Sequence, residues 1–264
     1  MEKINGRLTL GVLWGTILAC LIAYRLTAEY TNQSTFYISV LSDSFSSYKG
    51  ECPKDYRFYY DGERSGVTSV DEMWWSILCK QVSAKPLMIE ALSGCTVTEG
   101  IRVDSLIAAS NIKRCNNLNR GLLQPDLIII AVGINDYSCD VPIDDFSAAY
   151  SKMLQQIKDN YPGAIIVCVS PWFTQRGKWD GEAFRNELGL TIDEYSHIVD
   201  RISSEWDCLF FDGNVIGFTK ENYYPTYCID NEECPTHPNA AGQKLIGETL
   251  SKWMIYNRLL MMDD

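Results

Sequence analysis

The sequence predicts an α/β domain built on a parallel sheet that is covered by helices on both faces. Short apolar runs rich in Ile and Val alternate along the chain with stretches of helical periodicity. The apolar runs are bounded by Gly, Pro or Asp, a pattern typical of strands that are buried on both faces. The chain has 264 residues and is 46% hydrophobic, which suits one folded domain plus an appendage.

Five strands and five long helices are expected along the folded part of the chain. The apolar runs place strands at Phe36–Leu41, Leu87–Leu92, Leu127–Val132, Ala164–Val169 and Cys208–Phe211. Between and after them, helices are expected at Ser69–Val82, Val103–Cys115, Ile143–Asn160, Thr191–Trp206 and Asn239–Arg258. Pro238 lies near the first turn of the last helix, where proline is tolerated.

The N-terminus carries a candidate membrane segment. Leu8 to Tyr24 is a run of roughly 17 residues without charge, at the short end of what spans a bilayer. Lys3 and Arg7 precede the run, which favours an inside N-terminus and an exported remainder. A cleaved signal peptide, an uncleaved anchor, a lipoprotein signal and a buried helix all remain open. We expect an anchor or signal segment at 1–26, a linker at 27–35 and the folded domain at 36–264.

Composition excludes several classes of function. The net charge is −11, so the basic surface that nucleic-acid binding requires is missing. Cysteine and histidine do not recur at zinc-binding spacings. The first strand is followed neither by a G-x-G-x-x-G motif nor by a phosphate-binding loop, the two glycine-rich motifs that bind nucleotides. The sequence therefore offers no zinc site and no nucleotide-binding loop. Nine of the ten cysteines lie outside the apolar run, and export would permit a disulfide between Cys228 and Cys234.

Residues suited to acyl transfer follow the expected strands. Ser44 follows the first strand, Gly94 the second and Asn135 the third, while His237 lies between the fifth strand and the last helix. Parallel sheets bind ligands at the carboxyl ends of their strands, so these residues should meet there. Ser44 is the candidate nucleophile and His237 the candidate general base. The backbone N–H groups of Ser44 and Gly94 and the amide of Asn135 are candidate oxyanion donors. The other histidine, His197, falls inside an expected helix and is interpreted as structural.

Four ordered motifs in these positions resemble the SGNH (GDSL) hydrolases. The motifs are Ser42-Asp43-Ser44, Gly94, Gly133-Ile134-Asn135-Asp136 and His237-Pro238-Asn239. The resemblance covers nearly all of the domain, from Phe36 to the last helix. It implies a three-layer, flavodoxin-like sandwich with five parallel strands in the order 2-1-3-4-5. It also implies esterase, lipase or carbohydrate deacetylase activity without a cofactor, with the site residues in the roles given above.

The chain departs from this family pattern at two positions. Ser42 stands where the family usually has glycine, a mild change. Cys234 stands three residues before the histidine, where the family usually has the aspartate that orients the imidazole. One alternative is that another carboxylate replaces that aspartate, and the candidates are Asp230, Glu232 and Glu233. The other two alternatives are that a backbone carbonyl replaces it, or that most of the activity has been lost.

Two long aromatic loops are candidates for the substrate wall. One runs from Lys49 to Thr68 and the other from Ser170 to Glu182, and both should lie at the active-site edge of the sheet. Tyr60, Trp172 and Trp179 are the candidate substrate-binding residues, although such loops can also be packed by their own side chains.

Together these observations predict an exported serine esterase that is secreted or held at a membrane by its N-terminal helix. Its expected substrate is a short-chain ester on a small molecule or an acetyl ester on a carbohydrate. The alternatives are a catalytically impaired, glycan-binding surface protein with the same fold, or an acyltransferase.

Overall fold

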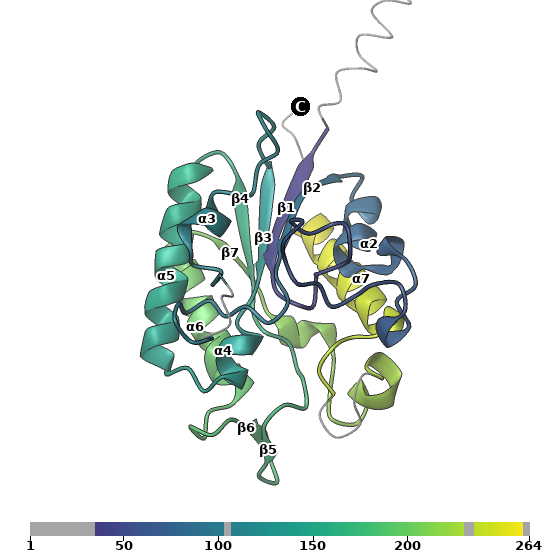
Figure 1. Cartoon of the computed structure of the whole chain (residues 1–264), viewed down its shortest axis with the longest axis vertical. Coiled ribbons are helices and arrows are strands. Elements are labelled where there is room, and N and C mark those ends of the chain that lie inside the picture. The colour runs from purple at the N-terminus through teal and green to yellow at the C-terminus, as the bar shows by residue number, and fades with distance from the viewer. Residues whose placement is uncertain (1–34, 103–106, 230–234, 261–264) are drawn as a thin grey trace, which may run out of the picture. The chain divides into compact units, whose positions relative to one another are not determined.

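A parallel sheet of five strands, in the order β2-β1-β3-β4-β7, forms the middle layer of the structure (Figure 1). The structure is a computed structural model and describes residues 35–102, 107–229 and 235–260. The strands are β1 (Tyr37–Ser42), β2 (Lys85–Ala91), β3 (Leu127–Ala131), β4 (Ile165–Val169) and β7 (Leu209–Phe211). The predicted five-stranded parallel sheet and its order are confirmed, with β7 as the fifth strand of the sheet.

Helices cover both faces of this sheet. On one face lie α2 (Trp74–Gln81) and α7 (Ala240–Tyr256), and on the other lie α5 (Ile143–Asn160) and α6 (Ile192–Glu205) (Figure 1). All five residues of β3 are buried, as expected for a strand packed between two layers of helices. The predicted three-layer sandwich is therefore confirmed.

The long helices begin and end close to where the sequence predicts. Thr191 caps α6 in a reciprocal capping box, in which its backbone N–H donates to Glu194 Oε2 at 2.7 Å. Asn239 caps α7, and its Oδ1 accepts from the Gly242 N–H at 2.9 Å. This second cap fixes the chain direction two residues after His237.

The prediction of a helix at Val103–Cys115 is wrong for most of the described residues in that range. Residues 103–106 lie outside the described residues, and only α3 (Ile112–Cys115) is helical. The N–H groups of Ala109 and Ser110 donate to the carbonyls of Thr96 and Val97, at 2.8 and 3.4 Å, and so cannot make helical bonds. Tertiary hydrogen bonding to the loop after β2 has overridden the local helical pattern.

The predicted helix at Ser69–Val82 is broken in two. A short 3-10 turn, η2 (Val70–Glu72), is separated from α2 by Met73, which has an extended ψ of 139°. The N–H of Trp74 donates to Gln243 Oε1 of α7 at 2.9 Å, which fixes the start of α2. Six short elements have no counterpart in the sequence pattern: α4 (Ile134–Ser138), β5 (Lys178–Trp179), β6 (Phe184–Arg185), η1 (Arg64–Gly66), η3 (Gly213–Ile216) and η4 (Tyr223–Tyr227).

The candidate anchor or signal segment at 1–26 lies outside the described residues, as does the predicted linker apart from Thr35. Within the part of the chain that the structure describes, no helix combines the length and the apolarity needed to cross a bilayer.

Candidate active site

The turn after β1 holds the candidate nucleophile. Ser44 lies two residues beyond the end of β1, and only 5% of its surface is exposed. The Asp43 carboxylate closes the turn, because its Oδ1 accepts from the Phe45 N–H at 3.0 Å. Gln243 of α7 donates from Nε2 to the Phe45 carbonyl at 3.0 Å. The turn is thus fixed from within and by a helix on one face of the sheet.

Ser42 fits the position where the family pattern has glycine. It continues β1 as a strand residue, so the position does not need the conformational freedom of glycine. Its buried hydroxyl donates to the Ala131 carbonyl at 2.8 Å and accepts from the Ser46 hydroxyl at 2.6 Å. The substitution adds a hydrogen bond between β1 and β3 and leaves no polar atom unpaired.

His237 faces Ser44 directly. Its Nε2 lies 3.0 Å from Ser44 Oγ, although 193 residues separate the two in the chain. The residues on either side of the histidine are held by tyrosines. The Tyr223 hydroxyl donates to the Thr236 carbonyl at 2.5 Å, and the Tyr60 hydroxyl donates to the Pro238 carbonyl at 2.7 Å. The 3.0 Å between His237 Nε2 and Ser44 Oγ lets an unprotonated Nε2 accept the serine proton.

Two aromatic rings orient the imidazole. The Tyr59 ring is stacked on His237, with 3.5 Å between ring centroids and an interplanar angle of 11°. Phe45 presents its ring edge-on at 5.5 Å. Tyr59 belongs to the aromatic loop at Lys49–Thr68, whose candidate substrate-binding residue was the neighbouring Tyr60. Nothing in the sequence separates the two tyrosines, because the contact depends on how the loop folds.

Gly94 and Asn135 line the same pocket as Ser44 and His237, a hollow of about 270 Å³. Gly94 has a φ of +83°, which favours glycine there. Asn135 lies in the first turn of α4, two residues after Gly133. At Gly133, φ is +124° and an added Cβ would lie 3.1 Å from the Pro171 ring, so the turn requires glycine. The structure therefore brings all four sequence-predicted residues to one pocket.

Two buried carboxyl groups brace the loops around this pocket. Asp136 accepts from the N–H groups of Val97 and Thr98 at 2.7 and 3.0 Å, which ties the loop after β2 to α4. Burial raises the pKa of Asp136 to about 6, and these two hydrogen bonds oppose the rise. Burial likewise raises the pKa of Asp43 to about 7, against the hydrogen bond from Phe45 and the positive charge of Arg114.

A buried ion pair joins α3 to β2 close to the site. Arg114 Nε lies 3.1 Å from Glu90 Oε1, and neither side chain is exposed. The guanidinium also donates from Nη2 to the carbonyls of Ser42 at 2.8 Å and Glu90 at 2.7 Å. Arg114 therefore links α3 to the ends of β1 and β2, and the end of β1 lies two residues before Ser44.

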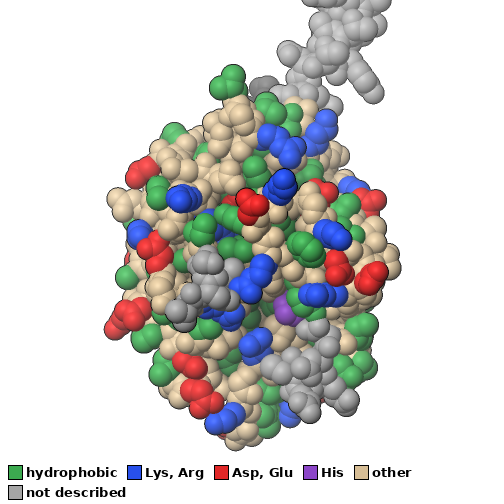
Figure 2. Space-filling view, viewed as in Figure 1, with side chains coloured by type: hydrophobic (Ala, Val, Ile, Leu, Met, Phe, Trp, Pro, Cys, Tyr) green, Lys and Arg blue, Asp and Glu red, His purple; other side chains and the backbone are tan. Residues whose placement is uncertain are grey.

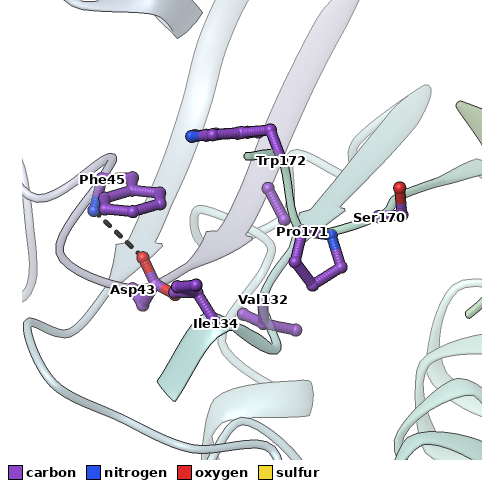
Figure 3. Close-up of a pocket in the computed structure, with 8 residues that line it drawn as sticks. Asp43, Phe45, Val132, Ile134, Ser170, Pro171 and Trp172 are labelled. Atoms are coloured by element: carbon purple, nitrogen blue, oxygen red, sulfur yellow. Dashed lines mark hydrogen bonds between the residues drawn. The ribbon is translucent and has the colours of Figure 1, made fainter. Parts of the chain in front are cut away.

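The remaining candidate residues are placed differently. Trp172 and Tyr60 are both buried, Trp172 with 3% of its surface exposed, so neither ring is available to stack on a sugar. Trp172 instead stacks on Phe45 at 5.1 Å, in the narrow crevice beneath the site (Figure 3). Trp179 is 41% exposed on β5, where Lys220 Nζ lies 3.8 Å from its ring centroid. It does not line the pocket of Ser44 and His237.

The candidate third acids, Asp230, Glu232 and Glu233, lie outside the described residues, and so does Cys234. That one of these carboxylates replaces the usual aspartate beside His237 stays a prediction. That Cys228 and Cys234 form a disulfide stays a prediction as well. Within residues 35–102, 107–229 and 235–260, no three or more His, Cys, Asp or Glu side chains are grouped so as to hold a metal ion.

Comparisons with known proteins match the chain to one family. The sequence model of the GDSL-like lipase/acylhydrolase family matches residues 36–171. No curated protein sequence matches the chain significantly.

Solved structures share the fold. A protein from Bacteroides ovatus described as a GDSL-like lipase is 20% identical, with a TM-score of 0.62 over 85% of this chain and 100% of its own. A similarly described protein from Bacteroides uniformis is 21% identical, with a TM-score of 0.61 over 85% and 97%. A carbohydrate acetylesterase family member from Sinorhizobium meliloti is 20% identical, with a TM-score of 0.60 over 86% and 99%.

Proposed function

Because the chain belongs to the GDSL-like lipase/acylhydrolase family, and is thus a carboxylic ester hydrolase, we propose that it cleaves short-chain esters by Ser44–His237 catalysis. The observation that carries this proposal is the 3.0 Å separation between Ser44 Oγ and His237 Nε2. The pocket around this pair also contains Gly94 and Asn135, the candidate oxyanion donors.

The reaction proceeds through an acyl-enzyme. His237 Nε2 takes the hydroxyl proton as Ser44 Oγ attacks the ester carbonyl. The N–H groups of Ser44 and Gly94 and the Asn135 amide stabilise the negative charge that develops on the carbonyl oxygen. His237 then gives its proton to the departing alcohol. Water, deprotonated by His237, attacks the acyl-enzyme and releases the carboxylic acid with Ser44 restored.

An acetyl group on a carbohydrate is the proposed physiological ester. The support for it is the similarity in fold to a carbohydrate acetylesterase family member. Trp179 on the β5–β6 hairpin offers an exposed ring outside the pocket for a longer glycan. Trp172 and Tyr60 have no part in this proposal, because both are buried.

The proposal also includes export, with the domain secreted or tethered by residues 1–26. Its support is the uncharged run from Leu8 to Tyr24 behind Lys3 and Arg7. Cell fractionation of the full chain should place it in the membrane or medium, and deletion of residues 1–26 should leave it in the cytosol. Recovery of the full chain from the cytosol would contradict export.

Hydrolysis of p-nitrophenyl acetate tests the catalytic assignment. Ser44→Ala should abolish turnover, and Asn135→Ala should lower kcat on the order of 100- to 1000-fold by removing one oxyanion donor. Ser204→Ala, at an exposed position of α6, serves as the matched control and should leave kcat unchanged. Undiminished hydrolysis by folded Ser44→Ala would refute the assignment.

A further inference from the structure

Two arginines line the pocket of the proposed nucleophile. Arg102 follows the loop after β2, and Arg176 lies in the loop between β4 and β5. Both line the hollow that contains Ser44 and His237. Among the described residues that line it, none is an aspartate or glutamate. In a chain whose net charge is −11, the charged side chains that the described residues bring to this pocket, apart from His237, are therefore both cationic.

Neither guanidinium is committed to an ion pair in the described part of the chain. The Nε of Arg102 is buried and has no hydrogen-bond partner there, which is costly for a cationic donor. Arg176 makes one long hydrogen bond, from Nη1 to Thr236 Oγ1 at 3.4 Å. Both residues are partly buried, so solvent screens their charge less than at the open surface.

The backbone that carries Arg176 is fixed in place. Its carbonyl accepts from the Tyr137 hydroxyl at 2.8 Å. The next residue, Gly177, has a φ of +96°, and a Cβ there would lie too close to the Arg185 carbonyl oxygen, so this turn requires glycine.

Figure 2 shows Lys and Arg side chains gathered across the middle of one face of the molecule, with Asp and Glu mostly nearer its edges.

We propose that this pocket selects an anionic ester, one that carries a carboxylate within reach of Arg102 and Arg176. Guanidinium groups pair with carboxylates through charge-assisted hydrogen bonds, and neither Arg102 nor Arg176 has a carboxylate partner among the described residues. The inference rests on the proposed function, because it assigns the substrate class of the same site. O-acylated uronic acids carry the carboxylate on the alcohol side of the ester, and monoesters of dicarboxylic acids carry it on the acyl side.

Paired esters test the proposal on both sides of the scissile bond. The alcohol-side pair is p-acetoxybenzoate and its methyl ester, and the acyl-side pair is mono-p-nitrophenyl glutarate and its methyl ester. The readout is the ratio of kcat/KM for the anionic ester to that for its neutral partner, compared between variants so that intrinsic reactivity cancels.

The arginine variants should lose the anionic ester selectively. In at least one pair, Arg102→Gln and Arg176→Gln should each lower the ratio roughly tenfold, and the double variant should lower it further. Raising the salt concentration should reduce the wild-type ratio as well. Arg201→Gln, which removes a surface charge paired with Glu205 on α6, should leave the ratio unchanged.

The outcomes separate this inference from the proposed function. Hydrolysis that depends on Ser44, with a ratio that neither arginine variant changes in either pair, would overturn the anionic specificity alone. Equal losses for both members of each pair would overturn it too, since they indicate a general defect. Hydrolysis that survives Ser44→Ala would instead overturn the proposed function. Thermal unfolding of each variant verifies that it is folded.

Discussion

At the scale of single residues, two aromatic rings contact His237, and Cys234 stands where the family pattern has the aspartate that orients the imidazole. The Tyr59 ring lies flat against the imidazole at 3.5 Å, and Phe45 packs edge-on against it. An aromatic face stabilises a nearby cation, so Tyr59 should favour the imidazolium that forms when His237 takes the serine proton. Tyr59 is thus a positioning residue that acts through His237.

Replacing Tyr59 separates this stacking role from mere loop packing. Tyr59→Leu should lower kcat several-fold to roughly tenfold with little change in KM, because the loss appears as the imidazolium forms. Tyr59→Phe keeps the aromatic face and should retain most of the activity. Equal losses in the two variants would show that the hydroxyl contact to Ser65 matters more than the ring.

The buried carboxyl of Asp43 makes stability depend on pH. Burial raises its pKa from 3.8 to about 7, so the folded state holds this proton to a higher pH than the unfolded state does. Its contribution to stability is complete below about pH 4 and is lost as the pH rises through about 7. Asp43→Asn cannot ionise. Between pH 4 and pH 7, the free energy of unfolding of the wild type should fall relative to that of the variant by a few kcal/mol. Parallel curves in denaturant titrations would contradict the raised pKa.

The sequence predicted the four candidate site residues that meet in the pocket, but not what surrounds them. Ser44, Gly94, Asn135 and His237 were found because each has a distinctive type and follows an expected strand. Tyr59, Arg102 and Arg176 were not found, because their proximity to the site depends on loop conformations that no local pattern encodes. Trp172 was misassigned for the same reason, since its loop turns the indole into the core.

At the scale of elements, the strands and long helices were predictable, while segments held by tertiary hydrogen bonds were not. The ranges of α5, α6 and α7 agree with the predicted ranges, and side-chain caps at Thr191 and Asn239 mark the starts of α6 and α7. Residues 107–111 did not form the predicted helix, because the N–H groups of Ala109 and Ser110 bond to the loop after β2. The sequence pattern cannot show a backbone partner that lies elsewhere in the chain.

The contact between α2 and α7 offers a test at this scale. At Gly247 in α7, an added Cβ would lie 2.6 Å from the Trp74 carbonyl oxygen and 3.0 Å from Ile77 Cβ. Gly247→Ala should therefore destabilise the protein by about 1–3 kcal/mol, despite the better helix propensity of alanine. Gly163→Ala has open space around its Cβ and is the matched control. A thermal midpoint for Gly247→Ala at or above that of the wild type would contradict the close packing.

At the scale of the whole molecule, the parallel sheet brings distant segments to one edge. Ser44 follows β1, Gly94 follows β2 and Asn135 follows β3, while His237 precedes α7. Because all the strands run in one direction, their carboxyl ends gather these loops around a single pocket. The buried pair of Arg114 and Glu90 fixes the strand ends beneath it. The fold thus supplies the alignment that the reaction requires.

The most direct measurement is labelling of the native protein with a fluorophosphonate probe, followed by mass spectrometry of the modified peptide. Only a serine activated by a base reacts readily with this reagent. We expect one labelled residue, Ser44, and loss of labelling in folded His237→Ala. An unlabelled wild type, a label on another serine, or equal labelling of Ser44 without His237 would contradict the account.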